Sequence, residues 1–252
     1  MGARKMVRRA FLAGSAAVAG GVVFGVYYVR RPLPNPLLDD LNDGEAALTP
    51  FVKIDAEGVT LITPRAEMGQ GVLSLQAHLI AEELDVDPRS VRTDPGKPDL
   101  AYHNTKVTES GAPFPGWEDG WWQERTRGAL EIAGRLLDMQ MTGGSTTVPD
   151  MYDRLRTAGA SARETLKAAA ARVSGVAVAE LTTEDGAVVL PNGRRLTYVE
   201  LAPEAAKTPV VTEVALRDPS QWRRLGKPMQ RIDVPAKCTG QTKYGIDLVF
   251  PN

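Results

Sequence analysis

The sequence predicts an α+β fold in which small β-sheets or hairpins pack with two principal helices. Two pairs of short apolar runs, each joined by a tight turn, indicate hairpins. Two longer stretches carry apolar residues at the helical period of 3.6 residues, and a glycine-rich loop accompanies each of them. The 252 residues, 43% of them hydrophobic, are enough for one or two domains with a buried core.

The first 31 residues are predicted to be an export signal. A basic start precedes residues 10–29, which carry no charge. Residues 8–12 (Arg-Arg-Ala-Phe-Leu) resemble a twin-arginine signal, which implies transport of the folded protein to the periplasm. No small-x-small cleavage site follows the apolar run, and about 20 apolar residues are enough to span a bilayer. We therefore expect the segment to remain uncleaved as an inner-membrane anchor. The alternative is a plain Sec signal. Residues 32–50 then read as a linker.

Residues 51–215 are predicted to form the main domain. A hairpin over 51–63 opens it, and the first glycine loop, 67–71, follows at once. Apolar spacing then predicts a helix over about 70–84. A short strand is expected at 91–93.

Residues 95–125 are expected to be irregular, because they are rich in proline and glycine. This segment also holds three tryptophans, Trp117, Trp121 and Trp122. Two interpretations stay open for them. They are either tucked against the core under a surface loop, or they form the wall of a substrate entrance or a contact with a partner subunit.

The next part of the domain is predicted to be mainly helical. A helix over 128–139 leads to the second glycine loop, 142–147, and a long helix over 151–173 follows. We expect Gly159 to mark close packing within that helix. The polar face of the long helix is expected to carry Arg154, Arg156, Arg163 and Lys167. Carboxylates away from the glycine loops are interpreted as solvated helix faces.

A second hairpin is predicted over 180–201, and a short helix over 197–206. Residues 216–252 are predicted to be a proline-rich, basic linker that ends in the first strand of a following domain. That strand is expected at 244–250, and the rest of its domain is expected to be missing from this chain.

Composition excludes several classes of site. Cys238 is the single cysteine, so the chain has no intramolecular disulfide and no iron–sulfur cluster held by four of its own cysteines. With only His78 and His103, a zinc site held by this chain is not expected. A net charge of −1 gives no reason to expect nucleic acid as a partner.

The two glycine loops are the candidate cofactor-binding elements. Glycine lets backbone N–H groups approach a ligand closely, and the dipole of a following helix favours an anion there. The candidate residues are Gly69, Gln70, Gly71, Gly143, Gly144, Ser145, Thr146 and Thr147. The alternative is purely structural: a strand-to-helix turn and a helix N-cap with its preceding turn.

Four ordered stretches resemble the molybdopterin-binding subunit of the xanthine dehydrogenase and aldehyde oxidase family, in its isoquinoline 1-oxidoreductase beta-subunit type. They are residues 67–71 with 81–84, residues 142–146, residues 155–163, and residues 231–247. The resemblance implies an incomplete molybdopterin-binding domain of the aldehyde oxidase type. It implies molybdenum held by a pyranopterin, as the molybdopterin cytosine dinucleotide. Gln70 would hydrogen-bond this cofactor, Gly69 and Gly71 would allow its close approach, and residues 143–147 would wrap its pterin or phosphate end.

The resemblance further implies an oxidoreductase that hydroxylates N-heterocycles or aldehydes and passes electrons to an iron–sulfur partner. The implied partners are a small 2Fe-2S subunit, a cytochrome c subunit and the remaining part of its own subunit. The family's catalytic base is a glutamate late in the chain in a Gly-Glu context, which this sequence lacks. We therefore assign no catalytic residue and expect the chain alone to be inactive. The alternatives are a non-catalytic, membrane-anchored binding or scaffold module and a non-functional truncated gene product.

Overall fold

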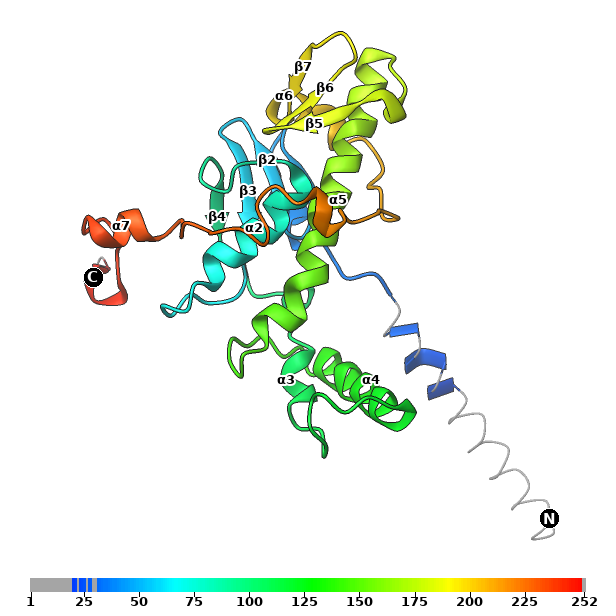
Figure 1. The fold of residues 1–252 in the computed structure, drawn as a ribbon, viewed down its shortest axis with the longest axis vertical. Helices are drawn as coiled ribbons and strands as arrows, with labels where there is room; N and C mark the ends of the chain where they lie inside the picture. Colours follow the sequence, from blue (N-terminus) through cyan, green and yellow to red (C-terminus); the bar gives the residue numbers. More distant parts are fainter. Residues whose placement is uncertain (1–19, 22, 26, 29–30, 251–252) are drawn as a thin grey trace, which may run out of the picture.

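The computed structural model describes residues 20–21, 23–25, 27–28 and 31–250. The predicted signal or anchor at 1–31 therefore lies almost wholly outside the described residues. Within the described ranges, no helix is long and apolar enough to cross a membrane. The architecture is α+β, as predicted: two small sheets lie along one long helix, and shorter helices extend away from them (Figure 1).

The first sheet places the first glycine loop. It has the strand order β1-β2-β3-β4, in which the first three strands run antiparallel and β3 pairs with β4 in parallel. Helix α2 (Val72–Leu84) connects β3 to β4, which confirms the predicted hairpin, helix and short strand. The strands are Ala46–Thr49 (β1), Val52–Asp55 (β2), Gly58–Ile62 (β3) and Arg92–Asp94 (β4). The first glycine loop thus follows a buried strand and precedes a helix.

The predicted linker at 32–50 is too long. Pro36–Asp40 form the 3-10 helix η1, and all four residues of β1 are buried in the sheet. Local propensity does not indicate β1, because two of its four residues are alanines, which are uncommon in strands. Pairing with β2 and burial against the core stabilise it instead.

The long helix α5 (Thr147–Ser174) crosses α2 at very close range. A Cβ built on Gly159 would lie 2.4 Å from the carbonyl oxygen of Ile80 and 3.1 Å from the Cβ of Glu83. The predicted role of Gly159 is therefore confirmed: only a residue without a side chain lets the two helices approach this far. The crossing fixes how the helix starts at the two glycine loops sit relative to each other.

A second, smaller sheet lies beside the C-terminal half of α5 (Figure 1). Its antiparallel strands are β5 (Thr182–Glu184), β6 (Ala187–Val189) and β7 (Arg195–Thr197), with η3 (Val178–Glu180) before them. Helix α6 (Tyr198–Ala205) follows, capped by Thr197 and Glu200 in a capping box. The predicted hairpin and short helix are confirmed.

Helices α3 (Lys106–Glu109) and α4 (Trp121–Leu136) form a helical extension at the N-terminal end of α5 (Figure 1). The preceding 3-10 helix η2 (Leu100–Tyr102) still belongs to the core, where Ala101 and Tyr102 are buried. Helix α4 thus begins seven residues earlier than predicted. The interpretation that the tryptophans are tucked against the core is wrong, since Trp117, Trp121 and Trp122 are 82%, 72% and 56% exposed.

The predicted strand at 244–250 is wrong. The C-terminal segment contains η4 (Pro219–Gln221), α7 (Val234–Cys238) and η5 (Gly245–Asp247), and the described residues offer no strand beside 244–250. A strand needs a neighbour for its backbone groups, and alternation in sequence does not supply one. The alternating apolar side chains, Tyr244, Ile246, Leu248 and Phe250, are instead 54–94% exposed.

Candidate functional site

The Glu67 side chain forms hydrogen bonds with the backbone of the first glycine loop. Its Oε1 accepts hydrogen bonds from the N–H groups of Gly69 (2.7 Å) and Gly71 (3.0 Å), and its Oε2 accepts from Leu73 N–H (3.1 Å). Arg231 Nη2 lies 3.1 Å from Oε1. Burial alone would raise the pKa of Glu67, but these N–H groups and Arg231 outweigh it and hold the pKa below its usual value. The carboxylate therefore occupies the anion position at the N-terminus of α2.

The exposed tip of this loop carries two side chains, those of Met68 and Gln70, beside the glycine backbone. Gly69 and Gly71 have φ of +105° and +89°, and a Cβ on either would meet open space. The turn's conformation, and not crowding within the chain, therefore requires glycine here. Gln70 accepts a hydrogen bond from Met68 N–H (2.6 Å) and donates one to the Ala66 carbonyl (2.9 Å). Its amide thus shapes the loop in this structure.

The second glycine loop divides into an exposed turn and a buried anchor. Gly144 and Ser145 are exposed in the left-handed region, with φ of +60° and +57°. Thr146 and Thr147 are buried. The Thr146 hydroxyl donates to the Gly143 carbonyl (2.7 Å), so it holds the turn. Of the predicted hydroxyls in this loop, that of Ser145 remains exposed.

The N-terminus of α5 differs from that of α2. No described side chain caps it, whereas Glu67 satisfies the corresponding groups at α2. The first turn of α5 offers the N–H groups of Thr147 and Val148, because Pro149 has none. Together with the helix dipole, these two groups are the part of the site that is suited to bind an anion. Such a ligand would meet the exposed backbone of residues 143–145 first.

The two loops meet directly. The backbone N–H of Ala66 donates to the Thr142 hydroxyl at 2.9 Å. Beneath them, Arg65 Nη2 and Asp150 Oδ2 lie 2.6 Å apart, and both side chains are fully buried. Asn104 adds a further tie, since its Nδ2 donates to the Met141 carbonyl and to the Thr146 hydroxyl. All the predicted site residues therefore lie in two adjacent turns.

Among the described residues, no group of three or more His, Cys, Asp or Glu side chains could hold a metal ion. Both histidines are buried, and each Nδ1 lies 2.7 Å from a backbone carbonyl oxygen (Ser74 for His78, Leu100 for His103). Burial lowers the pKa of both imidazoles. The described chain offers backbone groups in glycine turns. These suit a cofactor held through its organic part.

The carboxylates at the C-terminal end of α2 are not solvated, so that interpretation is wrong. The side chains of Glu82, Glu83 and Asp85 are fully or almost fully buried. Glu83 lies 2.7 Å from Arg156 Nη2 and 3.2 Å from Arg163 Nη1, which places these two arginines of α5 in the helix interface and not on a polar face. This network bonds α2 to α5 where the two helices cross, at the end of α2 opposite the first glycine loop.

The same acidic cluster also holds the segment that follows the second sheet. Glu82 accepts hydrogen bonds from three consecutive backbone N–H groups, 223–225, at 2.7–3.0 Å. Asp85 accepts from Arg217 Nη1 at 2.9 Å and lies 3.0 Å from Arg223 Nη1. The predicted linker is therefore attached to α2 by buried charges over this stretch.

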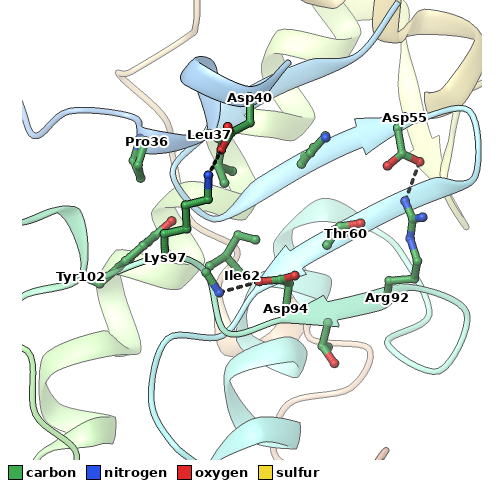
Figure 2. A pocket seen from close by; sticks show the side chains of 13 residues that line it. Pro36, Leu37, Asp40, Asp55, Thr60, Ile62, Arg92, Asp94, Lys97 and Tyr102 are labelled. Carbon is green, nitrogen blue, oxygen red and sulfur yellow. Dashed lines mark hydrogen bonds and ion pairs between the residues drawn. The ribbon is translucent and has the colours of Figure 1, made fainter. Parts of the chain in front are cut away.

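A pocket of about 390 Å³ opens beside the first sheet, and none of the predicted site residues lines it (Figure 2). Four of its charged side chains pair within the pocket, Lys97 with Asp40 and Arg92 with Asp55, and Lys53 pairs with Glu45 beside it. Because these charges are matched inside the chain, we do not take this pocket as the candidate site.

No protein-family model matches the chain. It is 28% identical to the beta subunit of isoquinoline 1-oxidoreductase from Brevundimonas diminuta, covering 98% of this chain and 32% of that protein. It is 28% identical to a membrane-bound aldehyde dehydrogenase (pyrroloquinoline-quinone) of Gluconacetobacter polyoxogenes (95% and 27% covered) and 27% identical to a nicotinate dehydrogenase subunit of Pseudomonas putida (88% and 16% covered). The chain thus spans about a third or less of the length of these curated relatives.

A solved structure, quinoline 2-oxidoreductase from Pseudomonas putida 86, matches 60% of this chain and 15% of its own at 22% identity, with a TM-score of 0.33. The curated relatives confirm the resemblance seen in the sequence, to the molybdopterin-binding subunits of the xanthine dehydrogenase family. This chain is therefore a relative of oxidoreductase subunits.

Proposed function

We propose that the chain is the N-terminal portion of the molybdopterin-binding subunit of an exported molybdenum hydroxylase. The enzyme would oxidise N-heterocycles or aldehydes and pass the electrons to an iron–sulfur partner subunit. One observation carries the proposal: the Ala66–Thr142 hydrogen bond joins two exposed glycine turns at the starts of two helices. The backbone N–H groups of the second turn suit the anionic, phosphate-bearing part of a large cofactor, since those of Gly69 and Gly71 in the first turn already bond to Glu67.

Within this site, the residues of the second loop would bind the anionic end. Gly143, Gly144 and Ser145 would offer backbone N–H groups, and the uncapped first turn of α5 would add its dipole. The exposed tip of the first loop, Gly69 to Gly71, would lie against the pterin. When bound, the molybdenum cofactor supplies the redox chemistry that no side chain of this region offers.

The proposal extends to partners and location. We expect a small 2Fe-2S subunit, a cytochrome c subunit and the remaining part of the same subunit, because two of the relatives are themselves named as subunits and are far longer than this chain. The basic, then uncharged N-terminus supports twin-arginine export to the periplasm, with retention at the inner membrane. The cofactor is proposed to be the cytosine dinucleotide form.

A second candidate is a non-catalytic binding or scaffold module. The observation that favours it is the first loop itself, where Glu67 and Gln70 already bond to the loop's own backbone. A loop used in this way needs no ligand to be stable.

Metal and nucleotide analysis of the native assembly separates the two candidates. The protein would be purified with its partners from its own host, grown with molybdate. Acid hydrolysis would then release any cytosine nucleotide, and the molybdenum would be measured on the same sample. Molybdenum and cytosine nucleotide in equal amounts support the hydroxylase. An assembly that contains neither supports the scaffold.

A further inference from the structure

Helix α4 presents an apolar face to the outside of the molecule. Residues 121, 122, 125, 129, 132 and 136 share one side of the helix at 100° per residue. Four of them are exposed large apolar side chains, Trp121, Trp122, Ile132 and Leu136, and the single charged residue among the six is Arg125. Soluble helices place such a face against a core.

The opposite face of α4 is already in use, so the apolar face is held outward. A Cβ on Gly134 would lie 2.9 Å from the Thr108 hydroxyl of α3, which shows how closely the two helices pack. Lys106 of α3 pairs with Glu131 of α4 at 2.7 Å. Helix α4 therefore cannot turn its tryptophans inward without breaking these contacts. It lies at the edge of the molecule, away from both sheets (Figure 1).

Helix α4 also contacts the residue at which the predicted anchor ends. Arg135 Nη2 donates to the Arg31 carbonyl at 2.6 Å. The Arg31 guanidinium in turn lies 4.0 Å from the centre of the Tyr28 ring. Residues 10–29, directly before this contact, carry no charge. If that segment enters a bilayer, α4 lies where the chain emerges from it.

The aromatic and basic residues on the exposed face of α4 are of the types found at a membrane–water interface. Tryptophan and tyrosine concentrate at that depth, and arginine extends its charge toward the headgroups. Trp117, Trp121 and Trp122 lie at the start of α4, and the Arg125 guanidinium stacks 5.2 Å from the centre of the Trp121 ring. Of the acidic residues nearby, Glu131 points the other way, to Lys106, while Glu118, Asp119 and Glu124 are exposed at the start of the helix.

We propose that α4 lies on the surface of a lipid bilayer, with its apolar face in the headgroup region beside the N-terminal anchor. This rests on the proposed retention of the N-terminal segment in the membrane, but not on the cofactor. Contact between α4 and the bilayer would orient the glycine loops relative to the membrane, because the second loop lies only a few residues after α4 and directly before α5.

Contact quenching of tryptophan tests the proposal on the full chain. The chain would be reconstituted into vesicles of phosphatidylethanolamine and phosphatidylglycerol, with plain or brominated acyl chains. Since two of the four tryptophans lie on the face, bromination should remove about half of the emission. A Trp121→Phe/Trp122→Phe variant should lose that quenching, and the matched control Trp222→Phe should keep it.

Three results would overturn the proposal. The first is equal emission in plain and brominated vesicles, and the second is equal quenching in the double variant. The third is protection of these tryptophans from aqueous acrylamide without quenching by bromine, which would assign the face to a second copy or a partner protein. Molybdenum content does not enter this measurement, so its outcome is independent of the proposed enzymatic function.

Discussion

The backbone N–H of Ala66 donates to the hydroxyl of Thr142 at 2.9 Å, although 76 residues separate the two in the chain. This bond brings two glycine turns together at the starts of α2 and α5. The crossing of those helices at Gly159 and the buried Glu83 network at that crossing support the same geometry. The candidate site is thus built on a rigid helix pair, and each of its supports can be tested separately.

Glu67 should act as the internal anion of the first loop. Glu67→Gln removes a charge that accepts three backbone hydrogen bonds and pairs with Arg231. We expect a loss of about 1–3 kcal/mol in the free energy of unfolding, measured in urea. Glu57→Gln is the control, because Glu57 is largely exposed and should change stability little. An equal effect of the two substitutions would contradict this role.

Gly159 should be irreplaceable for steric reasons. Gly159→Ala forces a methyl group against the Ile80 carbonyl and should destabilise the protein by about 1–3 kcal/mol. Gly128→Ala in α4 is the matched control, since its Cβ meets nothing within 4 Å. The control should raise stability by about 0.5–1 kcal/mol through helix propensity. Thermal or urea unfolding of both variants gives the comparison, and a stable Gly159→Ala protein would refute the close crossing.

Removing the charge of Glu83 should be costly. Glu83→Gln leaves the buried Arg156 without its carboxylate partner and Arg163 with Glu164 alone, and we expect about 3–5 kcal/mol of destabilisation. The exposed pair of Glu184 and Arg195 provides the comparison, because Glu184→Gln should have little effect. Urea unfolding distinguishes them. If Glu83→Gln were as mild as Glu184→Gln, the network would not support the helix crossing.

Asp85 should make stability depend on acid. Burial alone would raise its pKa, but hydrogen bonds from Arg217 and Thr183 and the charge of Arg223 outweigh burial and hold the pKa below 3.8. The folded pKa is thus below the unfolded one, so this contribution is fully present above pH 3.8 and is lost as pH falls through the lower folded value.

The variant Asp85→Asn isolates that contribution. Residue 85 has φ of +59°, which asparagine tolerates as well as aspartate does. We expect the variant to be less stable than the wild type at neutral pH and to show a shallower fall in stability between about pH 5 and pH 2. Unfolding free energies at several pH values check this, and parallel pH curves would contradict it.

Much of the fold follows from local patterns. The hairpins, α2, α5 and α6 are readable because their apolar periods agree with what they bury. The sequence does not reveal that β1 forms or that no strand forms at 244–250. In both segments, the presence of a neighbouring strand to pair with decides whether a strand forms. The early start of α4 is hidden by the proline and glycine residues around it.

For the site, the sequence identifies the turns but not their internal bonding. Glycine spacing before helices places both loops correctly. The sequence does not show the role of Glu67, because a carboxylate beside a glycine loop could equally be expected to point into solvent. Glu83 pairs with Arg156 and Arg163, which follow it by 73 and 80 positions in the chain. No local sequence pattern tells which arginine pairs with which acid. The apolar spacing of α2 extends across these acids, which is the one available signal that they are buried.

The most direct test of the central claim is the cofactor content of a Ser145→Asp protein purified with its native partners. Ser145 is exposed at φ +57°, which aspartate and asparagine both tolerate, and a carboxylate beside the N-terminus of α5 stabilises the helix. The fold should hold while the added charge repels an anionic cofactor. We expect about tenfold less molybdenum and pterin than in the wild type, equivalent to about 1.4 kcal/mol, and wild-type content in Ser145→Asn. Equal content in both variants would contradict a cofactor site at these two glycine loops.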